Sequence, residues 1–190
     1  MNNSSENICV KNDSISLLYA TLADRRTIFD MDFEDKTVYD SIFHGLVQPH
    51  PYNEEPDEED IEFHKGCKNK NNYLLIEYDN QIIGAISHTY NKGPIENMEI
   101  DITIRSAKFI GRGLGSQTII LLTDYLHNEY SIKTFIIRPS KLNKRAIRAY
   151  EKSGFKIIAD YNGSLYGDTE EDYYGDYGKD GTENMVKTYE

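Results

Sequence analysis

A strand-like stretch that leads into a glycine-rich turn and then into a helical stretch constrains this fold more than any other feature. Met98–Arg105 alternates strictly between apolar and polar residues, and a period of two predicts a strand with one apolar face. The turn Gly111-Arg112-Gly113-Leu114-Gly115 follows, and apolar residues then recur at helical spacing over 114–130. We therefore expect a strand, a tight turn and an amphipathic helix whose N-terminus lies at the turn.

Strand-like and helix-like stretches also alternate along the rest of the chain. A hairpin is predicted from the β-rich runs at 73–78 and 81–90, and shorter strands are predicted at 135–137, 155–159 and 185–189. A short strand and then a helix from about residue 24 are predicted over 15–31, and further helices are predicted over 35–47, 59–67 and 143–153. This order predicts a single α/β (α+β) domain over 1–190, in which helices cover both faces of one mixed sheet. A loose tail is expected at 1–13 and a long acidic loop at 162–182.

The charge of the chain bears on its partners. The 190 residues carry 21 Lys and Arg against 32 Asp and Glu, which gives a formal net charge of −11. Such a charge repels nucleic acid and anionic membranes and attracts cations, so we expect neither a nucleic-acid nor a membrane partner. A small cationic amine is a plausible partner, although the acidity can equally serve solubility alone.

The cysteine and histidine positions predict neither a disulfide framework nor a metal site. Cys9 and Cys67 are far apart and form no CxxC pair, which is typical of reduced thiols in a cytoplasmic protein. No two of the five histidines stand four residues apart, so no metal is expected. The first ten residues lack the basic and apolar regions of a signal peptide.

The glycine turn has the properties of an anion site. A helix N-terminus presents unpaired N–H groups and the positive end of the helix dipole, and glycines allow a phosphate to approach the backbone. Arg112 and Lys108 add positive charge. The spacing matches neither GxGxxG nor a P-loop, so a plain glycine-rich turn remains an equal alternative on this motif alone.

Asn143 and Tyr150 stand two helical turns apart and therefore share one face of the helix predicted over 143–153. A tyrosine on that face can donate a proton to a leaving group, but it can also be an ordinary core aromatic. Asn143, just before the helix, suits an N-cap. These alternatives stay open on the residues alone.

Together, two segments resemble a known family. Ile110-Gly111-Arg112-Gly113-Leu114-Gly115, followed by Asn143-x-x-Ala146-x-x-x-Tyr150-x-x-x-Gly154-Phe155, is similar to motifs A and B of the GNAT acetyltransferases. Within that superfamily, 143–155 looks most like the aminoglycoside 6′-N-acetyltransferases. The resemblance implies the GNAT fold, with a mostly antiparallel sheet of six to seven strands, and acetyl-CoA as co-substrate.

The resemblance also implies roles for single residues. The backbone of the turn would hold the pyrophosphate of acetyl-CoA, the strand would pair with the pantetheine arm, and a backbone N–H near Thr103 would polarise the thioester carbonyl. Tyr150 would protonate the departing thiolate, and the acceptor amine would attack directly. The cofactor-binding residues expected on this basis are Ile102, Thr103, Ile104, Ile110, Gly111, Arg112, Gly113, Leu114, Gly115, Ser116, Asn143 and Ala146.

An attacking amine must first lose a proton, because a free alkylamine has a pKa near 10. A carboxylate can hold the ammonium and accept that proton. Asp101 lies on the polar face of the predicted strand, with Glu99 two residues before it, so both are candidate acceptor-binding residues and Asp101 the candidate base. The alternative for both is a solvent-facing stripe.

Two positions depart from the family pattern. Ile110 stands where many GNAT proteins carry Arg or Gln, which a site built mainly of backbone amides tolerates. Arg138 stands where the aminoglycoside enzymes place an aspartate, and a cation at this acceptor-side position is expected to repel a polycationic antibiotic. The alternatives are therefore acetylation of a polyamine or a protein N-terminus, or a non-catalytic acetyl-CoA-binding module. A monomer and a homodimer are both compatible with the sequence.

Overall fold

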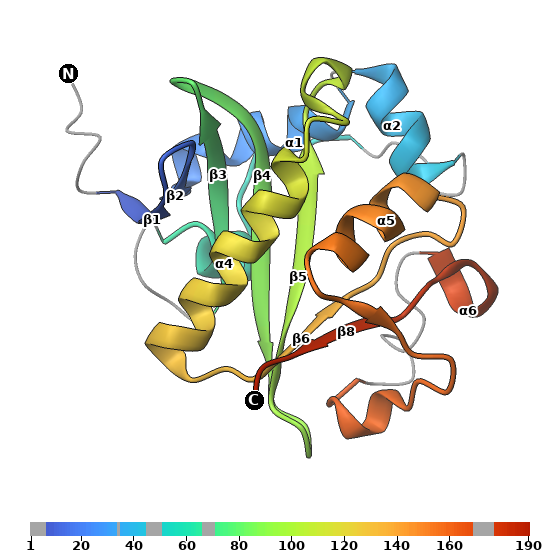
Figure 1. The fold of residues 1–190 in the computed structure, drawn as a ribbon. Helices are drawn as coiled ribbons and strands as arrows, with labels where there is room; N and C mark the ends of the chain where they lie inside the picture. The colour runs from blue at the N-terminus through green and yellow to red at the C-terminus, as the bar shows by residue number, and fades with distance from the viewer. Residues whose placement is uncertain (1–6, 34, 45–50, 66–70, 169–176) are drawn as a thin grey trace.

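The computed structural model describes residues 7–33, 35–44, 51–65, 71–168 and 177–190, and it contains one mixed sheet with helices on both faces (Figure 1). The strands are β1 Ile8–Lys11, β2 Ile15–Tyr19, β3 Asn72–Tyr78, β4 Gln81–Asn91, β5 Asn97–Ile104, β6 Thr134–Ile137, β7 Lys156–Ile157 and β8 Met185–Thr188. The helices are α1 Arg25–Phe33, α2 Lys36–Phe43, α3 Glu58–Phe63, α4 Leu114–Tyr130, α5 Lys144–Lys152 and α6 Gly178–Gly181. None of these helices is long and apolar enough to cross a bilayer.

The sheet has the order β1-β2-β3-β4-β5-β6-β8-β7, and its neighbouring strands are antiparallel except for the parallel pair β5 and β6. The predicted mixed, mostly antiparallel architecture is confirmed. The expected number of strands was too low, because the described residues form eight strands rather than six or seven.

The additional strand, β1, corrects the expectation of a loose tail at 1–13 for its described part, since residues 1–6 lie outside the described residues. Asn12 Oδ1 accepts hydrogen bonds from the N–H groups of Ser14 and Ile15, which forms a tight turn and folds β1 back onto β2. Cys9 and Val10 then pack against the main core. The apolar run at 8–10 is thereby half-buried, whereas Lys11 at the end of β1 stays exposed.

The core is divided between the two faces of the sheet. On one face, α4 and α5 pack over strand residues such as Leu74, Ile76 and Ile100, all of which are buried. On the other face, Leu75 and Ala85 form a smaller cluster with Met31 of α1. Leu74 and Leu75 are neighbours in sequence but face opposite layers, as the period of a strand requires.

The helix predicted over 114–130 is confirmed as α4, and the one over 143–153 as α5. The helix predicted over 35–47 is shorter, because α2 ends at Phe43 and the left-handed residue His44 terminates it. The strand predicted over 155–159 keeps only Lys156–Ile157. The described ends of the predicted loop 162–182 contain helical turns at 163–165 and 178–181, and residues 169–176 lie outside the described part.

Candidate active site

The candidate site begins where β5 and β6 separate. β5 pairs with β4 along its whole length, from Asn97 to Ile104. It pairs with β6 at only two positions, Met98 with Phe135 and Glu99 with Ile136. Since β6 ends at Ile137, just before an Arg-Pro step, the second half of β5 has no strand neighbour on that side among the described residues.

The direction of the peptide groups along β5 decides which of them face this gap. The N–H of Arg105 donates to the carbonyl of Ile83 on β4 at 3.0 Å. Because peptide groups alternate sides along an antiparallel strand, Thr103 also faces β4, whereas Ile102 and Ile104 face the gap. The backbone N–H near Thr103 that was expected to polarise the thioester carbonyl therefore belongs to Ile102 or Ile104. The N–H of Ile102 donates to Asp101 Oδ1 at 2.9 Å.

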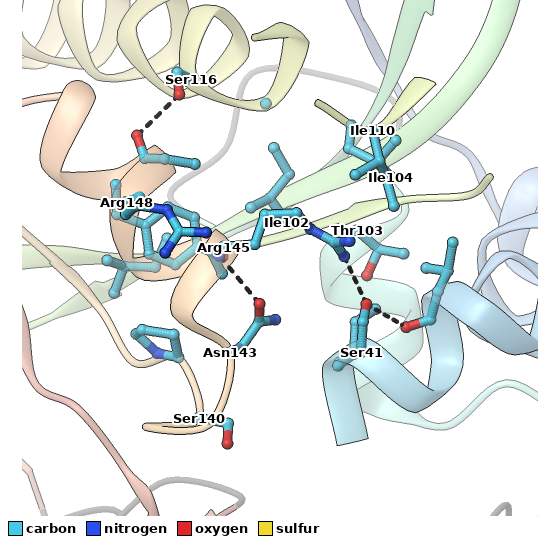
Figure 2. A pocket seen from close by; sticks show the side chains of 18 of the residues that line it. Ser41, Ile102, Thr103, Ile104, Ile110, Ser116, Ser140, Asn143, Arg145 and Arg148 are labelled. Carbon is cyan, nitrogen blue, oxygen red and sulfur yellow. Dashed lines mark hydrogen bonds between the residues drawn. The ribbon is translucent and has the colours of Figure 1, made fainter. Parts of the chain in front are cut away.

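A cavity of about 410 Å³ occupies the gap and continues between α5, the glycine turn and α2. Figure 2 shows three isoleucines from β5 and the turn on one side of it and polar residues of α5 on the other. The predicted residues that line the cavity are Asp101, Ile102, Thr103, Ile104, Ile110, Gly111, Gly113, Leu114, Gly115, Ser116, Arg138, Asn143, Ala146 and Tyr150. Glu99 and Arg112, which were also predicted, are absent from the lining.

The glycine turn presents backbone donors at one end of the cavity. Gly111 and Gly113 have φ values of +79° and +78°, a conformation that favours glycine, and Gly113 is the N-cap of α4. The next three N–H groups, from Leu114 to Ser116, precede the first intrahelical bond, which Gln117 donates to Gly113. A Cβ added to Gly115 would meet no atom within 4 Å, so the fold leaves open space directly at these donors.

The same end of the cavity is joined to α5. Ser116 Oγ donates to the carbonyl of Ala149 at 2.9 Å, and Ser153 Oγ donates to the carbonyl of Ser116 at 3.4 Å. The side chain of Ser116 therefore fixes the beginning of α4 against the second half of α5. Arg112 turns away from the cavity and donates to Tyr78 Oη at 3.2 Å, so its guanidinium does not add to the site as expected.

The cavity is also lined by three basic residues of α5, none of which was predicted as a site residue: Arg145, Arg148 and Lys152. Like charges three and four residues apart repel one another, and Lys144 and Arg145 lie in the first helical turn, where the dipole disfavours cations. Such a cluster in a chain of net charge −11 favours an anionic ligand. Arg145 extends across the cavity and donates to Ser41 Oγ of α2 at 2.7 Å (Figure 2).

Asn143 and Tyr150 each combine a structural role with a place at the cavity. Asn143 is the N-cap of α5, and its Oδ1 accepts from the N–H of Ala146 at 3.0 Å. Tyr150 lines the cavity and packs against the core with part of its ring. Burial, with smaller contributions from Asp101 and Tyr177, raises the pKa of Tyr150, so the phenol stays protonated at neutral pH and able to donate.

Of the two predicted acids, only Asp101 lines the cavity. Its side chain is exposed, and its charge acts on Tyr150. Glu99 shares its face of β5, as predicted, but both Glu99 oxygens accept from Arg138 Nη1, at 3.0 and 2.9 Å. Arg138 Nη2 donates to Asp168 at 2.7 Å and to Tyr161 Oη at 3.1 Å.

This cluster corrects the expectation that Arg138 is a repelling cation. The exposed fractions of the Arg138 and Asp168 side chains are 7% and 2%, so the pair is removed from solvent. Burial alone lowers the pKa of Arg138, but the charge of Glu99 and the bond to Tyr161 outweigh it and raise that pKa. One cation is thus matched by two carboxylates.

Among the described residues, no three His, Cys, Asp or Glu side chains gather as metal ligands do.

The comparisons with known proteins agree with this geometry. Residues 15–156 match the family model described as Acetyltransferase (GNAT) domain. The chain is 39% identical over 57 residues to a kanamycin resistance protein of Rhizobium radiobacter and to an aminoglycoside N(6′)-acetyltransferase type 1 of Klebsiella pneumoniae. These matches cover 30% of this chain, and 53% and 28% of the two relatives, respectively.

Solved structures with the same fold include an aminoglycoside acetyltransferase in complex with coenzyme A, with a TM-score of 0.64 and 20% identity over 92% of this chain and 95% of that one. Another is the spermidine N-acetyltransferase of Vibrio cholerae in complex with CoA and spermine, with a TM-score of 0.67 and 17% identity over 93% and 96%. At these identities the likeness shows the fold. The family model matches about three quarters of the length of this chain, and the chain therefore belongs to the GNAT acetyltransferase family.

Proposed function

We propose that this protein transfers the acetyl group of acetyl-CoA to a primary amine of a small cationic acceptor. One observation carries the proposal: a carboxylate, Asp101, and a protonated phenol, Tyr150, line the same cavity as an unblocked helix N-terminus. The first two groups suit proton transfer, and the third suits the phosphates of a coenzyme. A pure binding module needs neither Asp101 nor Tyr150.

The residues at the turn fit the coenzyme. The N–H groups of Leu114, Gly115 and Ser116 would bind its pyrophosphate, and the open space at Gly115 allows the close approach that this requires. Arg148 and Lys152 would add charge-assisted contacts to the phosphates. The gap-facing carbonyl of Ile102 and the gap-facing peptide group of Ile104 would pair with the amide-bearing arm of the coenzyme, as an added strand does. Acetyl-CoA would supply the acetyl group as an activated thioester.

Asp101 and Tyr150 would move the two protons that the reaction requires. The Asp101 carboxylate holds the acceptor ammonium and accepts its proton, directly or through one water, so that the amine can attack. The Tyr150 hydroxyl donates its proton to the departing sulfur. Its raised pKa means that the hydroxyl carries its proton at neutral pH. A gap-facing N–H of β5 stabilises the negative charge that develops on the carbonyl oxygen.

An aminoglycoside is the acceptor that we favour. The two relatives named for kanamycin resistance and aminoglycoside acetylation support it. The pairing of Arg138 with Glu99 and Asp168 removes the main objection, because the local charge is negative rather than positive. A polyamine is the second candidate, since the structural neighbour from Vibrio cholerae is named for spermidine and was solved with spermine.

A thiol-release assay with acetyl-CoA tests the proposal on kanamycin, tobramycin, spermidine and short peptides with free N-termini. Turnover with an aminoglycoside supports the favoured acceptor, and turnover only with spermidine or a peptide supports the alternatives. If calorimetry detects acetyl-CoA binding but no acceptor is turned over, the result supports the alternative of a non-catalytic acetyl-CoA-binding module. Such a reaction fits the predicted cytoplasmic location, and gel filtration decides between monomer and homodimer.

A further inference from the structure

Tyr177 lines the cavity although no sequence pattern pointed to it. It immediately precedes α6, and it is the one lining residue that the described chain after α5 contributes. It therefore brings the C-terminal part of the chain to a cavity that is otherwise built by β5, the turn, α2, α5 and the loop between β6 and α5.

The chain on either side of Tyr177 is fixed to that loop. Before it, Asp168 is held by the buried guanidinium of Arg138. After it, the carbonyl of Gly181 accepts from the N–H of Lys141 at 2.7 Å, and Thr182 forms a β-bridge with Ser140. These bonds attach the α6 turn to the segment that leads into α5, so Tyr177 has a defined place at the cavity.

That place is at the end of the cavity away from the phosphate-binding donors. Arg138, Pro139 and Ser140 stand before the first turn of α5, whereas Ser116 contacts its second half. α5 has nine residues, which separates its two ends by about 12 Å. Asp101, Tyr150 and Tyr177 all line this cavity, and the charges of the Asp101 carboxylate and the Tyr177 phenol both contribute to the raised pKa of Tyr150.

We propose that Tyr177 is an acceptor-binding residue, whose ring packs against the carbon skeleton of the amine while Asp101 holds the ammonium group. The inference rests on the proposed function and adds a specific contact to it. A tyrosine ring gives a large, rigid surface with a polar edge, which suits an acceptor that carries both C–H faces and hydroxyl or amino groups. The cofactor end of the cavity does not depend on it.

Steady-state kinetics with kanamycin and with spermidine test this role in Tyr177→Ala and Tyr177→Phe. Truncation to Ala should raise the acceptor KM about tenfold, as expected for the loss of an aromatic packing contact, and leave the Kd of acetyl-CoA unchanged. Phe keeps the ring and should retain most of the affinity. Tyr130→Ala, which removes an exposed tyrosine from the end of α4, is the matched control and should change neither constant.

The outcomes separate the two proposals. If the wild type turns over an acceptor but its KM is the same in Tyr177→Ala, the role of Tyr177 is refuted and the proposed function stands. A loss of acetyl-CoA affinity equal to the loss of acceptor affinity also refutes it, because the residue would then support the whole cavity. If the wild type acetylates no acceptor, the proposed function fails, and the acceptor-binding role fails with it.

Discussion

Adding one methyl group at Gly115 separates folding from coenzyme binding. Gly115 lies in the first turn of α4 with an ordinary helical backbone, and an added Cβ would meet nothing within 4 Å. Alanine is a better helix former than glycine by about 0.5–1 kcal/mol. For folding alone, Gly115→Ala should therefore be neutral or stabilising, with a rise in Tm of up to about 2–4 °C for a chain of this size.

Coenzyme binding should change in the opposite direction. The methyl group would occupy the space through which a phosphate reaches the first N–H groups of α4. The loss of one hydrogen bond to a charged group costs about 1.5–3 kcal/mol. Since 1.4 kcal/mol corresponds to a factor of ten, the Kd of acetyl-CoA should rise about ten- to hundredfold.

Isothermal titration calorimetry with acetyl-CoA, together with a thermal melt of the unliganded protein, measures both effects. Asn128→Ala is the matched control, because Asn128 is exposed on the same helix far from the turn. It should raise the Tm slightly and leave the Kd unchanged. A Gly115→Ala protein with wild-type affinity would refute the assignment of the phosphates to this helix end, whatever its melting temperature.

Other perturbations test the acids, the phenol and the buried ion pairs. Asp101→Asn should lower kcat/KM by about 10²- to 10⁴-fold with little change in acetyl-CoA affinity, and steady-state kinetics with calorimetry check this. Tyr150→Phe should lower kcat at the same coenzyme affinity, and a wild-type rate in thiol release would remove Tyr150 from the mechanism. Arg138→Met removes the cation that neutralises the buried Asp168 and should cost about 3–5 kcal/mol in urea unfolding, with partial recovery when Asp168→Asn is added. Burial raises the pKa of Tyr150 and of Tyr161, so their stabilising contribution is complete below about pH 10 and decreases above it, by about 1.4 kcal/mol per pH unit for each. Urea unfolding between pH 8 and 11.5 measures that decrease, and a flat profile would contradict it.

The sequence by itself determined the parts of the protein that depend on short-range patterns. The alternation over 98–105, the glycine turn and the helical spacing after it predicted β5, the turn and α4 closely. Asn143 was predicted as an N-cap and is one. These features are readable because a strand period, a helix period and a cap each involve residues only a few positions apart.

The tertiary structure decided the charge and shape of the cavity at the end where the acceptor is proposed to bind. Arg138 joins Glu99 and Asp168, which are 39 and 30 residues away, and this pairing reverses the electrostatic meaning of the cation. Tyr177 and the α2 residue Ser41 reach the cavity from segments that the sequence left as loop or helix without a role. The separation of β5 from β6 likewise follows from where β6 ends. Such contacts depend on register and on the packing of distant segments, and no local pattern in the chain encodes them.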